Sequence, residues 1–299
     1  MAGGPERRLA LRVDVDTRRG LDEGVPRLLD AFREAGVRAS FFVTMGPDRS
    51  GLALRRAWRP SFIRKMWRTG ALRLYGMRTV LSGTLLPARP VGAGAPHLLR
   101  QIAAEGHEVA PHGFDHVGWQ DGVHRMPAAR IREDLAAAAR AFEVAVGIRP
   151  EATAAPGWRS TPEALTVQEE CGYRYASDVR GVAPFRPLTA AGPLKTLQVP
   201  TTMPTMDELL GAERDVPRAL LAALRPGLNV FTLHAEVEGG PLLDAFRHFL
   251  REAVRVAEIV RLDEAAAAAG RVATAAVTRG NVPGRSGWLA VQEETCPAR

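Results

Sequence analysis

Apolar segments short enough to be strands alternate with amphipathic segments along most of the chain, and this alternation limits the folds that it can adopt. Residues 9–15 are apolar, as in a buried strand, and residues 25–35 follow as a helix because their apolar positions recur every three or four residues. The same pairing of strand and helix returns at residues 39–44, 96–105, 108–111 and 128–146. Such alternation favours a parallel sheet with helices packed against it.

The second half of the chain continues the pattern. Strands are expected at residues 153–155, 175–177, 197–199, 229–233 and 259–262, and a helix at 241–256. About seven strand–helix units predict an α/β barrel, in which functional side chains gather at the C-terminal ends of the strands. We expect a single domain over residues 1–299, with a barrel core at about 9–265, an insertion at about 46–95 and a C-terminal tail at about 270–299.

Charge and cysteine content indicate which kinds of partner and which cellular compartment to expect. The formal charge is +7 and the pI is about 10.3, which favours a phosphate-bearing substrate or an anionic membrane surface. Nucleic acid is not an expected partner, because no recognisable nucleic-acid module is present. Cys171 and Cys296 stand in no disulfide or metal spacing, and no segment resembles a signal core or a membrane span, so we expect a cytoplasmic protein. The sequence leaves the oligomeric state open.

Two aspartates end the first expected strand. Side chains alternate along a strand, so Asp14 and Asp16 share one face at a separation of roughly 6–7 Å. Two buried carboxylates on one face are costly unless a positive charge lies between them, and a metal ion commonly supplies it. The alternative is that one aspartate caps the next segment and the other is solvated.

Two histidines follow the expected strand at residues 108–111. His112 and His116 are four residues apart, a spacing that puts both imidazoles on one side of a helical turn. With Asp16 they form a set of two histidines and one carboxylate, which suits zinc or another divalent first-row ion. Asp14 is placed to take a proton from an activated water, and His234, at the end of a later strand, to donate one from the opposite side.

Five short motifs occur in the order found in the polysaccharide deacetylase superfamily, which this chain resembles. They are Asp-x-Asp at 14–16, His-x-x-x-His at 112–116, Pro-Gly-Trp-Arg at 156–159, Ser-Asp at 177–178 and Leu-His at 233–234. The resemblance implies a distorted (β/α)7 barrel that removes N-acyl groups from amino sugars. It covers nearly the whole chain, insertion and tail included.

Longer matches narrow the resemblance to one branch of the superfamily. Residues 112–120, 177–187, 234–239 and 279–289 are similar to enzymes that remove the formyl group from 4-deoxy-4-formamido-L-arabinose linked to undecaprenyl phosphate. This implies a metal-dependent hydrolase that yields formate and a free amino sugar for lipid A modification and resistance to cationic peptides. It also implies a lipid-linked substrate and a peripheral place on the cytoplasmic face of the inner membrane. An N-deacetylase for another amino sugar or glycan, a binding module without activity and a structural barrel remain alternatives.

The resemblance assigns the reaction to a few side chains. Asp14 is the implied general base and His234 the implied general acid. Asp16, His112 and His116 are the implied ligands of one divalent ion, with zinc favoured and manganese, cobalt or nickel as alternatives.

Four further residues receive supporting roles from the resemblance. Arg159 is expected to orient Asp14, and Asp178 to tune the general acid. We expect Trp119 and Glu236 to contact the substrate. The chain departs from the superfamily in two places, since Asp-Val-Asp replaces adjacent aspartates and Ala-Pro-Gly-Trp-Arg replaces an Arg-x-Pro-aromatic motif.

Part of the insertion has helical periodicity. Within residues 60–76, apolar side chains fall on one side of the expected helix and basic side chains on the other, with Phe62, Ile63, Met66, Trp67 and Leu74 forming the apolar stripe. Such a stripe can pack on the core of the protein. It can also lie in the headgroup region of an anionic membrane, which is the hypothesis that a lipid-linked substrate favours.

Overall fold

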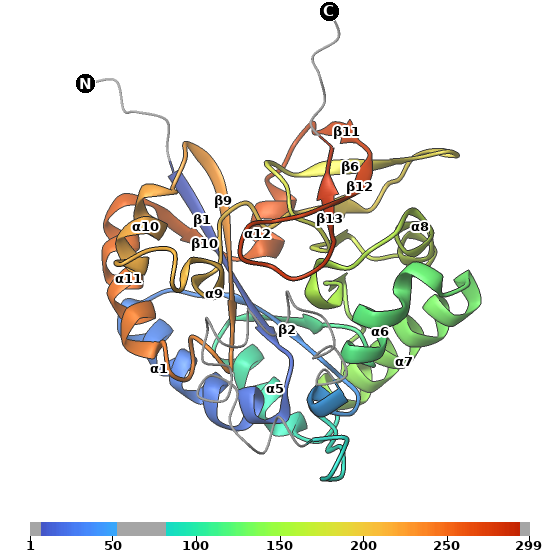
Figure 1. Cartoon of the computed structure of the whole chain (residues 1–299), viewed down its shortest axis with the longest axis horizontal. Helices are drawn as coiled ribbons and strands as arrows, with labels where there is room; N and C mark the ends of the chain where they lie inside the picture. The colour runs from blue at the N-terminus through green and yellow to red at the C-terminus, as the bar shows by residue number, and fades with distance from the viewer. Residues whose placement is uncertain (1–6, 53–81, 294–299) are drawn as a thin grey trace, which may run out of the picture.

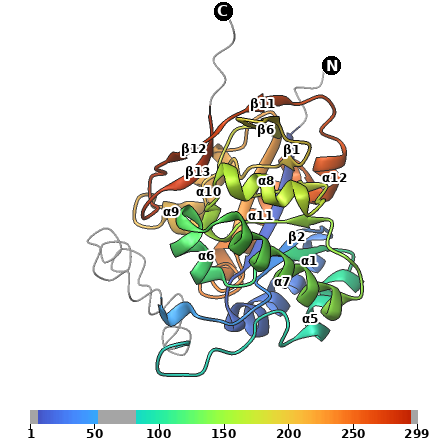
Figure 2. The same ribbon diagram turned by 90° about the vertical axis from the view of Figure 1, so that its right-hand side faces the viewer.

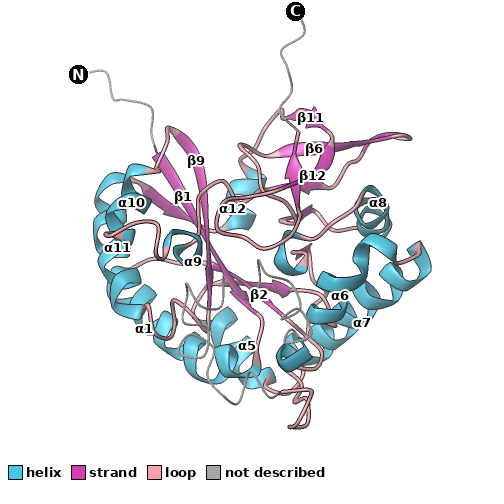
Figure 3. Ribbon diagram, in the orientation of Figure 1, coloured by secondary structure: helices cyan, strands magenta, loops and turns pink. Residues whose placement is uncertain are grey.

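A barrel of mainly parallel strands occupies the centre of the molecule (Figures 1 and 3). The computed structural model describes residues 7–52 and 82–293, so the segment at 60–76 lies outside the described residues. The barrel strands follow one another in chain order as β1 (Arg7–Val15), β2 (Ser40–Val43), β3 (Glu108–Pro111), β4 (Ala152–Thr153), β5 (Tyr175–Ala176), β8 (Leu197–Gln198) and β9 (Gly227–His234).

Hydrogen bonds close the barrel. β1 runs parallel to β2 on one side and to β9 on the other, and β4, β5 and β8 form a second parallel group. Ala154 N donates to Pro111 O at 3.3 Å between β3 and β4, and Thr202 N donates to Val230 O at 3.1 Å between β8 and β9. A short strand, β10 (Glu258–Val260), pairs with the first half of β1.

Helices surround the barrel, as Figure 2 shows in the view turned by 90°. They are α1 (Val25–Ala35), α5 (Pro96–Ala104), α6 (His116–Gly122), α7 (Ala128–Val146), α8 (Pro162–Glu170), α9 (Met206–Leu209), α10 (Val216–Ala222), α11 (Leu243–Val256) and α12 (Leu262–Ala267). α1 has a proline in its first turn and ends at Gly36, whose φ of 65° is accessible to glycine at little cost. Among the described residues, no helix has the length and apolar character to span a membrane.

The alternation of β1 separates two environments. Leu9, Leu11 and Val13 belong to the apolar layer between the strands and the helices. Ala10 belongs to a separate cluster inside the barrel, rich in small side chains such as Ala110, Ala152 and Ala154. These small residues leave room for the side chain of Arg12, which is fully buried on the inner face.

The sequence-based expectations for α1 and α7 are confirmed to the residue, and the barrel strands are confirmed within one or two residues. Several short strands were not expected: β6 (Phe185–Thr189), β7 (Gly192–Pro193), β11 (Ala273–Ala275), β12 (Val277–Gly280) and β13 (Leu289–Gln292). β11 pairs with β6, so the tail joins the second sheet. The division into core, insertion and tail stays a prediction.

The described ends of the insertion meet in a hydrogen-bonded neck, formed by residues 46–52 and 82–91. Asp48 N donates to Arg89 O and Gly51 N donates to Ser82 O, both at 2.8 Å. Val91 N closes the same ladder onto Gly46 O at 2.8 Å. The neck therefore holds the two ends together where β2 leaves the barrel.

Candidate active site

Three predicted metal ligands meet at the C-terminal ends of the barrel strands. Asp16 follows β1, His112 follows β3 and His116 opens α6. The Asp16 Oδ1 atom lies 3.4 Å from His112 Nε2 and 3.2 Å from His116 Nε2. All three ligand atoms lie within 4.8 Å of one another. This is a possible site for one metal ion.

The surroundings of two of these atoms fit a cation. Asp16 Oδ1 and His112 Nε2 are buried and make no hydrogen bond with any described residue. His112 Nδ1 lies 2.9 Å from Ala154 O, which fixes the proton on Nδ1 and leaves the Nε2 lone pair facing Asp16. Burial lowers the pKa of His112 to about 4, so its imidazole is neutral near pH 7, as a metal ligand must be. Burial alone would raise the pKa of Asp16, but the neighbouring imidazoles hold it well below its usual range.

The two histidines do not share one helical turn, contrary to the expectation from their spacing. His112 ends a strand connection, and only His116 is helical. Gly113 turns the chain between them with a φ of 70°, a backbone conformation that glycine adopts readily. The carboxylate of Asp134, on α7, accepts hydrogen bonds from Phe114 N and Asp115 N at 3.0 and 3.1 Å. A strand end, a glycine turn and a buried acid therefore place the pair.

Asp14 lies beside the metal ligands and is held by an arginine from its own strand. Its Oδ2 atom is 3.7 Å from His112 Nε2. Arg12 Nε and Nη2 donate to the two oxygens of Asp14, each at 2.7 Å. Both side chains are almost completely buried. Arg12 Nη1 also donates to Ser177 Oγ at 3.1 Å, which anchors the guanidinium across the barrel.

The predicted contact between Arg159 and Asp14 is wrong. The guanidinium of Arg159 instead lies over the ring of Trp288, at 4.6 Å from the ring centroid, with Nη2 at 3.4 Å from Ser286 O. Arg12 takes the predicted position because residues two apart on a strand share a face. The same rule that paired Asp14 with Asp16 could have identified Arg12.

The predicted tuning of His234 by Asp178 stays a prediction, and the described partners of Asp178 are other residues. Asp178 is fully buried, and its carboxylate accepts hydrogen bonds from Ala155 N at 2.7 Å and Gln198 Nε2 at 2.9 Å. These bonds join the ends of β4, β5 and β8. Asp178 therefore stabilises the barrel wall.

His234 ends β9 and faces the same site. Its backbone N donates to Glu238 Oε2 at 2.6 Å. Its ring packs edge-to-face against Trp158, with 6.0 Å between the ring centroids. Burial lowers the pKa of His234, and the charges of Asp16 and Asp207 act in the opposite direction. After Asp16, the acid that most raises the pKa of His234 is thus Asp207, which the sequence analysis did not single out.

An ion network that includes one tail residue contacts Trp158, the ring beside this histidine. Arg285, in the loop between β12 and β13, donates to Asp207 Oδ1 at 3.0 Å and to Glu208 Oε1 at 2.7 Å. Arg180 Nη1 shares Glu208 Oε1 at 2.7 Å. Both guanidiniums lie over the ring of Trp158, at 4.7 Å for Arg285 and 5.2 Å for Arg180. In the sequence, Arg285 lies within the segment 279–289 that resembles the deformylases, but that resemblance did not predict its partners.

The two predicted substrate contacts have different environments. Trp119 is 1% exposed and donates from Nε1 to Arg159 O at 2.7 Å, so packing encloses the ring, and its substrate contact stays a prediction. Glu236 is buried near Asp16, and burial raises its pKa well above the usual range. A Cβ on Gly20 would lie 2.4 Å from Glu236 Oε2, so glycine there leaves room for the carboxyl group.

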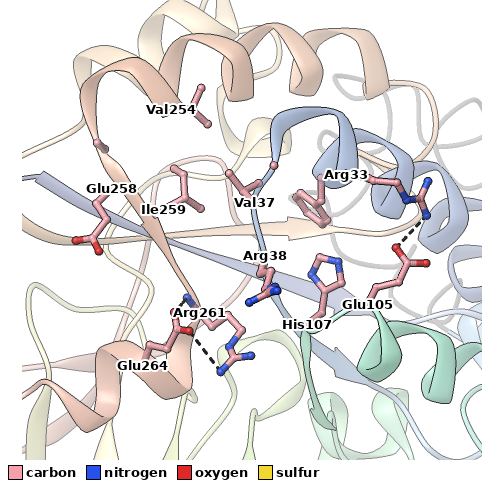
Figure 4. Close-up of a pocket in the computed structure, with 13 residues that line it drawn as sticks. Arg33, Val37, Arg38, Glu105, His107, Val254, Glu258, Ile259, Arg261 and Glu264 are labelled. Atoms are coloured by element: carbon pink, nitrogen blue, oxygen red, sulfur yellow. Dashed lines mark hydrogen bonds and ion pairs between the residues drawn. The ribbon is translucent and has the colours of Figure 1, made fainter.

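A separate cavity of about 700 Å³ opens at the opposite end of the barrel, near the start of β2 and β10 (Figure 4). It contains none of the predicted site residues. Its charged side chains pair with one another, as in Arg33 with Glu105 at 2.9 Å and Arg261 with Glu264 at 3.4 Å. These pairs leave the cavity without a clear preference for one ligand charge.

The fold and the site together define an α/β-barrel hydrolase with a candidate metal centre of two histidines and one carboxylate. Residues 2–176 match the family model of the polysaccharide deacetylases, and the chain belongs to this family. The fold is the distorted (β/α)7 barrel that the sequence predicted.

Two curated relatives narrow the class. The chain is 36% identical over 251 residues to a probable 4-deoxy-4-formamido-L-arabinose-phosphoundecaprenol deformylase of Shewanella sediminis, covering 82% of this chain and 81% of the relative. It is 28% identical over 283 residues to a protein of the same name from Wigglesworthia glossinidia brevipalpis, covering 92% and 99%. The chain is therefore a carbon–nitrogen amidohydrolase with a deformylase or deacetylase role.

A solved structure supports the fold alone. A protein from Mycobacterium smegmatis, assigned to the polysaccharide deacetylases, superposes with a TM-score of 0.64 at 20% identity. The superposition covers 94% of this chain and 97% of the other.

Proposed function

We propose that this chain hydrolyses the N-formyl group of 4-deoxy-4-formamido-L-arabinose linked to undecaprenyl phosphate. The observation that carries the proposal is the convergence of Asp16, His112 and His116 with two proton-transfer candidates, Asp14 and His234, in a chain similar to two named deformylases. The products would be formate and a free amine for lipid A modification, which supports resistance to cationic peptides.

The ligand set suits one divalent ion. Two imidazoles and one carboxylate with open positions are typical of catalytic zinc, and manganese, cobalt or nickel are the alternatives. When bound, such an ion polarises a carbonyl and lowers the pKa of a water molecule. The orphaned Asp16 Oδ1 and His112 Nε2 are the atoms that we assign to it.

Proton transfer falls to Asp14 and His234. Asp14 accepts the proton of the attacking water, since each carboxylate oxygen keeps a lone pair beyond its bond to Arg12. Arg12 fixes the direction of the carboxylate. His234 donates a proton to the departing sugar nitrogen from the other side of the site. Through Trp158 and Asp207, Arg285 acts as a positioning residue for that ring.

The remaining proposed roles concern binding of the substrate and contact with the membrane. Glu236 is proposed to contact the sugar, because its Oε2 is buried and makes no hydrogen bond with a described residue. Arg159 and Trp119 position the loop after β4. The polyprenyl tail of the substrate stays in the bilayer, so the enzyme would work at the cytoplasmic face of the inner membrane. The helix expected at 60–76 is a candidate contact with anionic lipid.

We expect the purified protein to release formate from the lipid-linked formamido sugar. The reaction removes the mass of one carbonyl unit from the lipid-linked sugar, so mass spectrometry of the lipid product and an enzymatic formate assay give independent readouts. The matched N-acetyl analogue is the control. Acetate release without formate release would favour the alternative deacetylase instead.

Chelation is expected to remove both the ion and the activity. After treatment with a strong chelator, one divalent ion per chain should restore turnover, because Asp16, His112 and His116 offer one site. Elemental analysis gives a readout separate from activity. His112→Gln should lose the ion, whereas His248→Gln, an exposed histidine on α11, should keep it. Full activity in a rigorously metal-free preparation would refute this mechanism.

A further inference from the structure

Two guanidinium groups stack on one tryptophan of the tail. Trp288 stands immediately before β13, and Arg279 lies in β12, its antiparallel partner. The Cζ atom of Arg279 lies 4.7 Å from a Trp288 ring centroid, and that of Arg159 lies 4.6 Å from one. The indole therefore gathers two positive charges from distant parts of the chain.

The stack is connected to the candidate site through neighbouring residues. Arg159 directly follows Trp158, whose ring contacts His234. The Arg159 carbonyl accepts the bond from Trp119 Nε1, and Trp119 lies three residues after His116 on α6, so the two residues are about one helical turn apart. Figure 2 shows β12 and β13 on the same side of the molecule as α6 and α9.

The local chain is shaped to hold these groups. Gly287, at a φ of 78°, approaches Arg159 so closely that a Cβ there would lie 2.8 Å from Nη2. Arg279 is paired with Ala290 through its backbone, but among the residues that the structure describes its guanidinium contacts only the ring of Trp288. By contrast, Arg180 and Arg285 both bond to Glu208. Two guanidiniums over one ring repel each other, and a bound anion would offset that repulsion.

We propose that Arg159, Arg279 and Trp288 form a subsite for the phosphodiester of the substrate. This rests on the proposed function. The formamido nitrogen and the anomeric phosphate lie on opposite sides of the pentose ring, so a formyl group at the metal centre places the phosphate one sugar away. The guanidinium of Arg279, which lies over the indole, keeps its N–H edge for an oxyanion, and its fork matches phosphate geometry. The subsite would thus select phosphate-linked sugars.

The test compares two soluble formamido sugars, one linked to a short prenyl phosphate and one carrying a methyl group instead of the phosphate. Loss of one charge-assisted hydrogen bond predicts that Arg279→Gln raises KM for the phosphodiester about tenfold. Its effect on the methyl glycoside should be much smaller. Arg279→Lys, which keeps the charge, should recover part of the loss. Arg251→Gln, an exposed arginine on α11, is the matched control.

Equal effects of Arg279→Gln on both sugars, or no effect on either, would overturn the subsite. A separate calorimetric titration with methyl prenyl phosphate needs no turnover, so it distinguishes this inference from the proposed function. Binding to the wild type that weakens in Arg279→Gln supports the subsite even if neither sugar is deformylated. Absence of binding overturns it. Inorganic phosphate that binds as tightly as the diester would also overturn it, because the site would then serve free phosphate.

Discussion

Asp14→Asn is expected to lower kcat by about a hundredfold to ten-thousandfold, while the protein still binds one divalent ion per chain. Asp14 is a carboxylate beside the metal ligands that is not itself in the ligand set, with Oδ2 at 3.7 Å from His112 Nε2. The asparagine amide keeps the size of the side chain but cannot accept the proton of the attacking water. Single-turnover kinetics and elemental analysis measure the two effects separately.

Asp16→Asn is the matched comparison, because it changes the carboxylate two residues further along the chain, just after β1. It should lose the ion itself, since Asp16 Oδ1 is one of the three converging ligand atoms. A fall of equal size in metal content for both variants would mean that Asp14 also coordinates. Thermal unfolding must be measured alongside, because Asp14→Asn also removes the charge partner of Arg12.

Arg12→Leu is expected to lower the free energy of unfolding by about 3–5 kcal/mol, because it leaves the Asp14 carboxylate buried without its cation. Both side chains lie inside the barrel, at 0% and 2% exposure. Chemical denaturation measures the loss. Adding Asp14→Asn to Arg12→Leu should recover part of it, since no charge is then left alone in the barrel.

Arg8→Leu is the matched control for this prediction. Arg8 lies on the same strand and pairs with Glu258 at 3.3 Å, but the two side chains are 30% and 60% exposed. Water screens such a pair, so its removal should cost about 0–1 kcal/mol. Similar losses for Arg8→Leu and Arg12→Leu would show that burial of the Arg12–Asp14 pair is not the cause.

The local periodicity of the sequence was enough to predict most of the barrel. α1 and α7 follow a stripe of apolar residues that repeats along one helix, and such a pattern depends only on neighbours in the chain. The tail strands have no such pattern. β12 and β13 are only four residues long. β12 is largely exposed, and the two strands form because they pair with each other and because Val291 of β13 pairs with Arg180. Pairing partners of this kind lie outside any local window.

The residues of the candidate site also divide into those that the sequence could predict and those that depend on contacts between distant parts of the chain. Asp14, Asp16, His112, His116 and His234 could be predicted because strand ends of a parallel barrel meet at one face. The residues that contact them could not all be predicted from the positions of strand ends. Arg12 could have been predicted, because it lies two residues before Asp14 on β1 and therefore shares its face. Arg285 could not, because it reaches the site from a tail loop whose position depends on the folded chain.

The hydrogen-bonded neck at residues 46–52 and 82–91 has a consequence for the evolution of this enzyme. Its ladder, from Asp48 and Arg89 to Gly51 and Ser82, fixes the exit and return of the chain whatever lies between them. Lengthening a segment whose ends are already joined costs only about 0.6 kcal/mol for each doubling. The neck therefore gives natural selection two joined points, near residues 52 and 82, at which sequence can be exchanged, and a protein engineer could use the same two points to graft a new recognition module.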